Sequence, residues 1–265
     1  MMKHLLGLSE PPGPAVRHAA PPGHLSPAAV SGTMPDGFLA GISPFDTGIP
    51  DVVALSAAYR TGRFAHDLYQ VSGITCPEAL LTAGEKRRAE FLAGRLLARA
   101  ALASLGLPPA GIGIGAGGAP LWPAGIMGSI SHSAGRCICL VRNDAAILLG
   151  ADTERHATGR ALTAILRLVL TDADRAMNAA LGLPGFPALV FSAKETLYKL
   201  LHPVVQRHFG FPCAEAAEPP QDGTLVLRLT RDLHPSLPAG AAFPIRYTTD
   251  ATHVTTWAVA DRPPG

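Results

Sequence analysis

The fold is decided by residues 84–106, which read GEKRRAEFLAGRLLARAALASLG. Strong helix formers (Ala, Leu, Arg and Glu) dominate this stretch, and Gly106 followed by two prolines ends it. We therefore predict a helix from about Ala83 to Leu105. At about 100° per residue, small apolar side chains share one face, which we expect to be the packing face: Ala89, Ala93, Leu96 and Ala100.

Basic side chains run beside this packing face. Arg88, Arg95 and Arg99 form a stripe, and Arg87 lies further round the helix. Long basic side chains on a helix commonly cover apolar surface while their charge stays in water, which is the simplest explanation here. A guanidinium group also matches the geometry of phosphate, so a phosphate site is the alternative.

Strand patterns follow the helix. Residues 136–142 (RCICLVR) and 145–154 (AAILLGADTE) predict two strands that flank a tight turn at Asn143 and Asp144. The remaining periodic stretches predict helices at 159–170 and 186–201 and strands at 224–229, 243–248 and 253–259. This order predicts an α+β fold with two comparable halves, residues 51–149 and 150–265. The Pro- and Gly-rich segment 1–50 is expected to be flexible.

Composition limits the classes of function. The chain has 265 residues, 48% of them hydrophobic, enough for one large domain or two packed halves. Its formal net charge of +2 gives no general sign of a nucleic acid or membrane partner. The four cysteines lack the spacing of a zinc site or a disulfide framework, and no apolar run is long enough to span a bilayer. We expect a cytoplasmic protein with reduced thiols, and a monomer, because two halves in one chain remove the need for a dimer.

Two carboxylates close the second predicted strand. Asp152 and Glu154 are two residues apart, so they point to the same side of the strand. They follow an apolar run at 147–149, and a divalent cation would relieve their mutual repulsion. The alternative is a solvated strand end, which needs no ligand.

The helix predicted at 186–201 carries a third carboxylate. Lys194 and Glu195 are adjacent, and Lys199 lies one turn beyond Glu195. An ordinary surface ion pair explains this spacing if the segment stands alone. If Glu195 joins Asp152 and Glu154, the three would instead suit magnesium bound through substrate phosphates.

A Ser-His pair lies within GSISHS, residues 128–133. Ser131 and His132 are adjacent, which rarely lets a nucleophile reach its base, and no G-x-S-x-G elbow is present. The hydroxyl groups, backbone N–H groups and imidazole suit an anion site. A hydrogen-bonded turn before the strand is the equally simple alternative.

The order of four motifs is more specific than any one of them. KRRAEFLAGRLLARAAL (86–102), GAPLWPAGIMGSISHS (118–133), GADTE (150–154) and FSAKETLYKLLHP (191–203) occur together. This combination resembles the 4'-phosphopantetheinyl transferase superfamily, in the branch of the enterobactin-synthase and mycobacterial enzymes. The resemblance implies two pseudo-symmetric α/β halves, each a small, mostly antiparallel sheet packed on a long helix, with the active site in the cleft between them.

The resemblance also implies residue roles. The magnesium ligands would be Asp152, Glu154 and Glu195, with Mn²⁺ as a possible substitute. The groups that bind coenzyme A would be Arg87, Arg95, Ser131, His132, Lys194 and Lys199. The residues closest to the chemistry would be Glu195, Lys194 and Asp152, and the identity of the general base is open between Glu195, Lys194 and a metal-bound water.

The implied reaction transfers 4'-phosphopantetheine from coenzyme A to a serine of an apo acyl, peptidyl or aryl carrier protein and releases adenosine 3',5'-bisphosphate. Two alternatives remain open. The same carboxylates with water as nucleophile would make a magnesium-dependent hydrolase of nucleotides or phosphodiesters. A degenerate relative would bind coenzyme A or carrier proteins without turnover, although the intact Asp152, Glu154, Lys194 and Glu195 argue against it.

Overall fold

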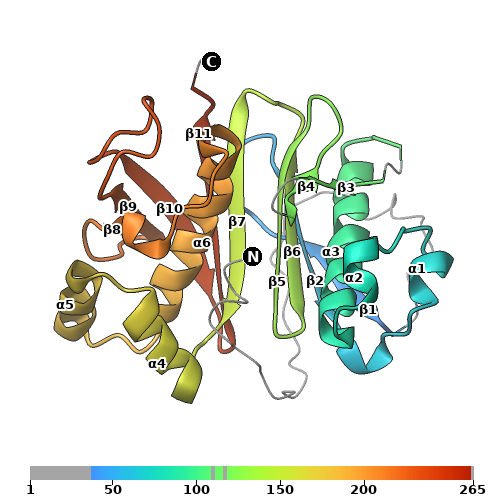
Figure 1. Cartoon of the computed structure of the whole chain (residues 1–265), viewed down its shortest axis with the longest axis horizontal. Coiled ribbons are helices and arrows are strands. Elements are labelled where there is room, and N and C mark those ends of the chain that lie inside the picture. The colour runs from blue at the N-terminus through green and yellow to red at the C-terminus, as the bar shows by residue number, and fades with distance from the viewer. Residues whose placement is uncertain (1–36, 109–110, 116–117, 264–265) are drawn as a thin grey trace.

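The computed structural model describes residues 37–108, 111–115 and 118–263. Two sheet-bearing halves lie side by side, each with a long helix, as Figure 1 shows. The α+β prediction with two antiparallel sheets packed on helices is confirmed. Within the described ranges, no helix is long and apolar enough to cross a membrane.

The first half is a four-stranded antiparallel sheet in the order β1-β2-β6-β5. Its strands are β1 (Leu39–Pro44), β2 (Val53–Tyr59), β5 (Met127–Ser133) and β6 (Arg136–Arg142). The long helix α3 (Glu85–Ser104) packs on this sheet, and the predicted packing face is confirmed because all four of its residues are buried. The smaller elements are α1 (Leu68–Val71), α2 (Glu78–Leu81), β3 (Gly113–Ile114), β4 (Pro120–Leu121) and a 3₁₀ turn, Thr61–Arg63.

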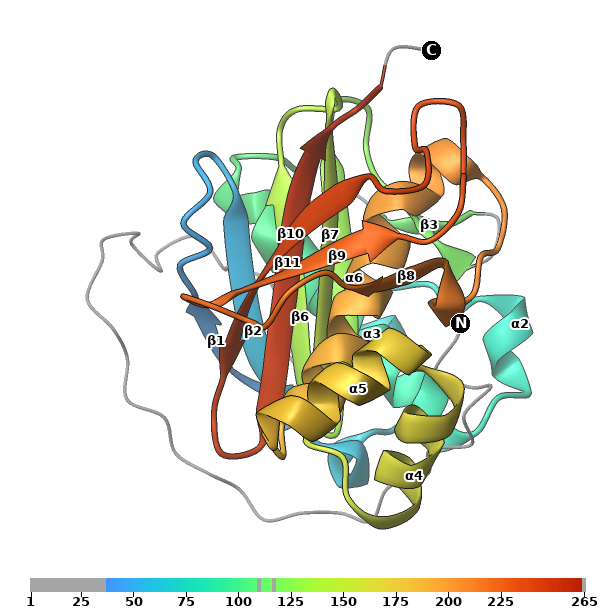
Figure 2. The same ribbon diagram turned by 90° about the vertical axis from the view of Figure 1, so that its left-hand side faces the viewer.

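The second half is a five-stranded antiparallel sheet in the order β7-β11-β10-β9-β8. Its strands are β7 (Ile147–Arg155), β8 (Ala214–Ala216), β9 (Thr224–Leu229), β10 (Ala242–Thr249) and β11 (His253–Asp261). Helix α6 (Phe186–Val205) packs on β7 and β11, while α4 (Gly159–Leu168) and α5 (Asp172–Leu181) lie at one end of the sheet (Figure 2). A 3₁₀ turn, Phe211–Cys213, leads into β8.

Strand β6 explains why the two halves hold together. Its central residues are all buried, so it is covered on both faces, as its continuous apolar run implies. Cys137, Cys139 and Val141 pack in the core beneath α3, whereas Ile138 and Leu140 pack in the core of the second half. One strand therefore contributes to both hydrophobic cores.

The predicted turn at Asn143 and Asp144 does not close a hairpin. Strands β6 and β7 belong to different sheets, so this turn carries the chain from one half to the other. The actual hairpin joins β5 to β6 through Ala134 (φ 44°) and Gly135 (φ 83°), two positive values that suit a tight two-residue turn. Residues 128–133, for which a hydrogen-bonded turn was one alternative, thus belong to strand β5.

Strand β1 lies inside the segment that was expected to be flexible. Residues 1–36 of that segment are outside the described part of the chain. Leu39–Pro44 pairs with β2 as a largely exposed edge strand whose register shifts between Ala40 and Ser43. Its Gly and Pro content hides the strand from sequence patterns, because an edge strand tolerates both while its neighbour supplies the hydrogen bonds.

The two halves meet where β5 lies beside β7 (Figure 1). Helix α6 approaches β7 so closely at Gly150 that a Cβ there would lie 2.4 Å from the carbonyl oxygen of Thr196. Glycine is therefore required by the contact between strand and helix. This close approach brings α6 against the strand that carries Asp152 and Glu154.

Candidate functional site

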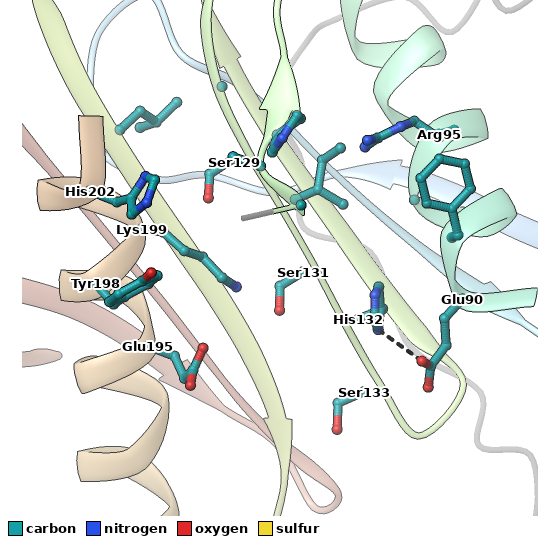
Figure 3. A pocket seen from close by; sticks show the side chains of 18 of the residues that line it. Glu90, Arg95, Ser129, Ser131, His132, Ser133, Glu195, Tyr198, Lys199 and His202 are labelled. Atoms are coloured by element: carbon teal, nitrogen blue, oxygen red, sulfur yellow. Dashed lines mark ion pairs between the residues drawn. The ribbon is translucent and has the colours of Figure 1, made fainter. Parts of the chain in front are cut away.

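A cavity of about 560 Å³ lies along the seam between the halves. Its walls come from α3 and β5 on one side and from β7 and α6 on the other (Figure 3). Six of the predicted site residues with charged or titratable side chains line it: Arg87, Arg95, His132, Glu154, Glu195 and Lys199. Residues from four elements, distant in sequence, therefore share one cavity.

Helix α3 supplies a basic wall. The guanidinium of Arg95 donates to the carbonyl oxygen of Gly113 at 3.2 Å and lies 4.5 Å from the ring centre of Phe91. Burial lowers the pKa of Arg95 to about 10, so the side chain keeps its charge at neutral pH. Arg87 lies about two turns earlier, with Nη1 3.4 Å from Nε2 of His132. This wall is suited to anions.

The other two arginines of the stripe face elsewhere. Arg88 contacts His66 and lies over the ring of Phe64, and Arg99 donates to the carbonyl oxygen of Ser72. Neither lines the cavity. The stripe thus divides into residues that face the cavity and residues that tie α3 to the preceding loop.

Serine hydroxyls on β5 reach across the seam to β7. Alternate residues of a strand share a face, and Ser129, Ser131 and Ser133 all lie on the face toward β7. The hydroxyl of Ser131 donates to Oδ1 of Asp152 at 2.7 Å, and that of Ser133 donates to Oε2 of Glu154 at 2.8 Å. Ser131, which we expected to contact a phosphate, therefore orients a carboxylate with its side chain.

Asp152 is completely buried and does not line the cavity. It accepts hydrogen bonds from Ser131, from Ser192 at 3.0 Å and from the ammonium of Lys199 at 2.7 Å. Lys199 lines the cavity as well, so its charge lies between the buried carboxylate and the cavity. Asp152 and Lys199 therefore form an ion pair at the edge of the cavity.

Two of the three carboxylates expected to bind magnesium line the cavity. Glu154 and Glu195 line the cavity from β7 and α6, and carboxylate oxygens are the ligands that magnesium prefers. No group of three or more His, Cys, Asp or Glu within residues 37–108, 111–115 and 118–263 is arranged to hold a metal ion. On the side formed by β7 and α6, the cavity therefore has two carboxylates, and a third, Asp152, lies behind them and accepts a hydrogen bond from Ser131.

Lys194 does not reach the cavity, contrary to the roles expected for it. Its ammonium donates to Asp174 at 2.6 Å and to the carbonyl oxygen of Val169 at 2.9 Å, and only 2% of the side chain is exposed. Consecutive residues of a helix point about 100° apart, so Lys194 turns toward α5 where Glu195 turns toward the cavity. Burial lowers the pKa of Lys194, and the charge of Asp174 opposes that shift.

Glu90 lines the cavity, although the sequence analysis did not single it out as a site residue. It lies three residues after Arg87, hence on the same side of α3, so the helical spacing was a usable signal for it. Ser133, which belongs to the GSISHS motif, lines the cavity as well.

A buried histidine contacts the backbone of β5 next to its serines. Nε2 of His253 lies 3.2 Å from the carbonyl oxygen of Ser133, and 7% of the residue is exposed. Burial, followed by the charge of Arg136, lowers the pKa of His253 to about 4. The neutral imidazole therefore donates this hydrogen bond at neutral pH.

We expect acid to destabilise the protein through His253. Because the pKa is about 4 when folded and about 6.5 when unfolded, the unfolded state binds more protons between these values. This residue's contribution to the free energy of unfolding is complete above pH 6.5 and should fall by about 2 kcal/mol by pH 5. Urea unfolding at pH 7.5 and 5 should show a smaller pH dependence for His253→Asn than for the unaltered protein. If the free energy of unfolding changed equally between pH 7.5 and pH 5 in both proteins, the role of His253 would be contradicted.

Comparisons with known proteins find similarity to one family of transferases. Residues 76–142 match the family model for the 4'-phosphopantetheinyl transferase N-terminal domain. The chain is similar to 4'-phosphopantetheinyl transferase Svp of Streptomyces mobaraensis (38% identity, 54% of this chain, 60% of the relative) and PptT of Mycobacterium tuberculosis (42%, 48% and 56%). It is also similar to enterobactin synthase component D of Salmonella typhi (38%, 46% and 51%). The match thus spans between half and two thirds of the length of these relatives.

Proposed function

We propose that the chain, part of which matches the 4'-phosphopantetheinyl transferase family, transfers the 4'-phosphopantetheine group of coenzyme A to a serine of an apo carrier protein. The second product is adenosine 3',5'-bisphosphate. The observation that carries the proposal is the cavity shared by the basic side chains of α3 and the carboxylates of β7 and α6. Phosphoryl transfer needs both kinds of group, because it depends on positioning and charge neutralisation more than on covalent help.

The basic side of the cavity is the proposed coenzyme A site. Arg87, Arg95 and His132 would bind its phosphate groups, and Lys199 would bind the pyrophosphate from the opposite wall. Lys194 is left out of this set because its ammonium is buried against Asp174.

The acidic side is the proposed magnesium site. Glu154 and Glu195 would hold the ion together with phosphate oxygens, while Asp152, which is buried and does not line the cavity, would add negative charge behind them. When bound, the ion would neutralise charge on the phosphates and on the leaving oxygen. Ser133 fixes the orientation of Glu154, and Ser131 fixes that of Asp152.

The transfer replaces one phosphorus–oxygen bond by another. The carrier serine oxygen forms a bond to the β-phosphorus while the bond from that phosphorus to the bridging oxygen breaks, and adenosine 3',5'-bisphosphate leaves with the bridging oxygen. Glu195, which lines the cavity, is the proposed acceptor of the serine proton. Lys194 is unsuited to this role because it has no exposure to the cavity.

Mass spectrometry of apo carrier proteins tests the proposal. The protein, coenzyme A, Mg²⁺ and a panel of fatty-acid, polyketide, peptide and siderophore carriers should give a carrier that is heavier by about 340 Da, the mass of the transferred group. EDTA should stop the reaction, and excess Mg²⁺ or Mn²⁺ should restore it. Cleavage of coenzyme A with an unmodified carrier would instead indicate a hydrolase, and binding without any product would indicate an inactive relative.

A further inference from the structure

An acidic residue lies in the basic part of the cavity. Glu90 lines it and is 9% exposed. Its carboxylate lies 3.7 Å from Nδ1 of His132, 3.9 Å from the ammonium of Lys86 and 4.0 Å from Nη1 of Arg87. A carboxylate repels the phosphates for which this wall is suited, so its presence needs a physical reason.

The contacts of His132 give a physical reason for a carboxylate at this position. Arg87 can only donate hydrogen bonds, so Nε2 of His132, 3.4 Å from its Nη1, must be the acceptor in this contact. The single proton of a neutral imidazole then lies on Nδ1, on the side of Glu90, where Figure 3 draws the ion pair. Glu90 thereby favours the tautomer whose Nε2 faces Arg87, and it would also stabilise the protonated ring once a phosphate draws a second proton to Nε2.

Glu90 has a similar relation to Arg87. The two residues are three apart on α3, and Arg87 is more exposed than Glu90, with side-chain exposures of 36% and 12%. A long, partly exposed side chain loses rotamer freedom when it binds a ligand. A buried carboxylate nearby reduces that loss by holding the guanidinium near the position where it binds.

We propose that Glu90 is a positioning residue of the coenzyme A site, which orients His132 and Arg87 toward one phosphate group. The inference rests on the proposed function. Glu90 touches neither reacting atoms nor the serine nucleophile in this scheme. Its removal should therefore weaken the binding of coenzyme A and leave the rate at saturating coenzyme A nearly unchanged.

Isothermal titration calorimetry with coenzyme A and Mg²⁺ tests the proposal on the full chain. Glu90→Gln keeps the shape of the side chain and removes its charge, and it should raise Kd and KM for coenzyme A about tenfold with kcat within about twofold. Glu90→Ala, a second variant, should weaken binding further. The matched control is Glu85→Gln, an exposed residue of the same helix outside the cavity, which should change Kd by less than about twofold.

A double-mutant cycle identifies the path of the effect. If Glu90 acts through His132, then Glu90→Gln should change Kd much less in a His132→Asn protein than in the unaltered one. Unchanged or tighter binding by Glu90→Gln, or effects of the two substitutions that simply multiply, would overturn the inference. If the unaltered protein binds coenzyme A but modifies no carrier, the proposed transfer is wrong. The positioning role of Glu90 is then still tested by the Kd values for coenzyme A. No binding of coenzyme A by the unaltered protein would overturn both.

Discussion

Glu195→Gln should lower the rate of phosphopantetheine transfer about a thousandfold or more. Glu195 lines the cavity from α6, where it is both a proposed metal ligand and the proposed proton acceptor. The amide has nearly the same shape but neither accepts the serine proton nor neutralises a divalent cation. The loss should therefore appear in kcat, measured by carrier mass shift over time, with the unfolding midpoint close to that of the unaltered protein.

Glu218→Gln provides the control for this experiment. Glu218 is an exposed glutamate outside the cavity, so the same chemical change there should alter the rate by less than about twofold. Transfer by Glu195→Gln at more than a tenth of the normal rate would contradict both roles of Glu195. The metal site proposed here would then be wrong, whatever the status of coenzyme A binding.

Lys194→Met should destabilise the fold by about 3–5 kcal/mol. The substitution leaves the completely buried carboxylate of Asp174 without its cationic partner. Asp174 also accepts the backbone N–H groups of Thr171 and Ala216, so its charge is fixed in place and joins the start of α5 to β8. Urea unfolding should show the loss as a lower midpoint.

A double variant separates the structural role from a role in binding. Asp174→Asn together with Lys194→Met removes both charges, and it should recover part of the stability that Lys194→Met loses. Below its unfolding transition, Lys194→Met should bind coenzyme A within about twofold of normal, because the side chain does not line the cavity. Normal stability combined with a large rise in KM would restore Lys194 to the coenzyme A site.

Local sequence patterns were sufficient for much of the fold. The helix around Ala89 and Leu96, the strand run RCICLVR and the three C-terminal strands each carry their own periodicity, and the structure confirms them. Sequence patterns did not predict strand β5, because its small polar residues lack the apolar alternation of a typical strand. Its hydroxyl groups instead bind the partner strand β7, a signal that exists only across the seam.

For the site, the sequence by itself determined which chemical groups are present, and the order of its motifs indicated the family. It could not determine which way each group points. Lys194 and Glu195 are neighbours in sequence, yet one is buried against Asp174 and the other lines the cavity. Glu90 and His132, 42 positions apart, meet only because α3 packs on the sheet that contains β5. Side-chain direction and long-range contact arise from the packing of helices on sheets, which no local pattern specifies.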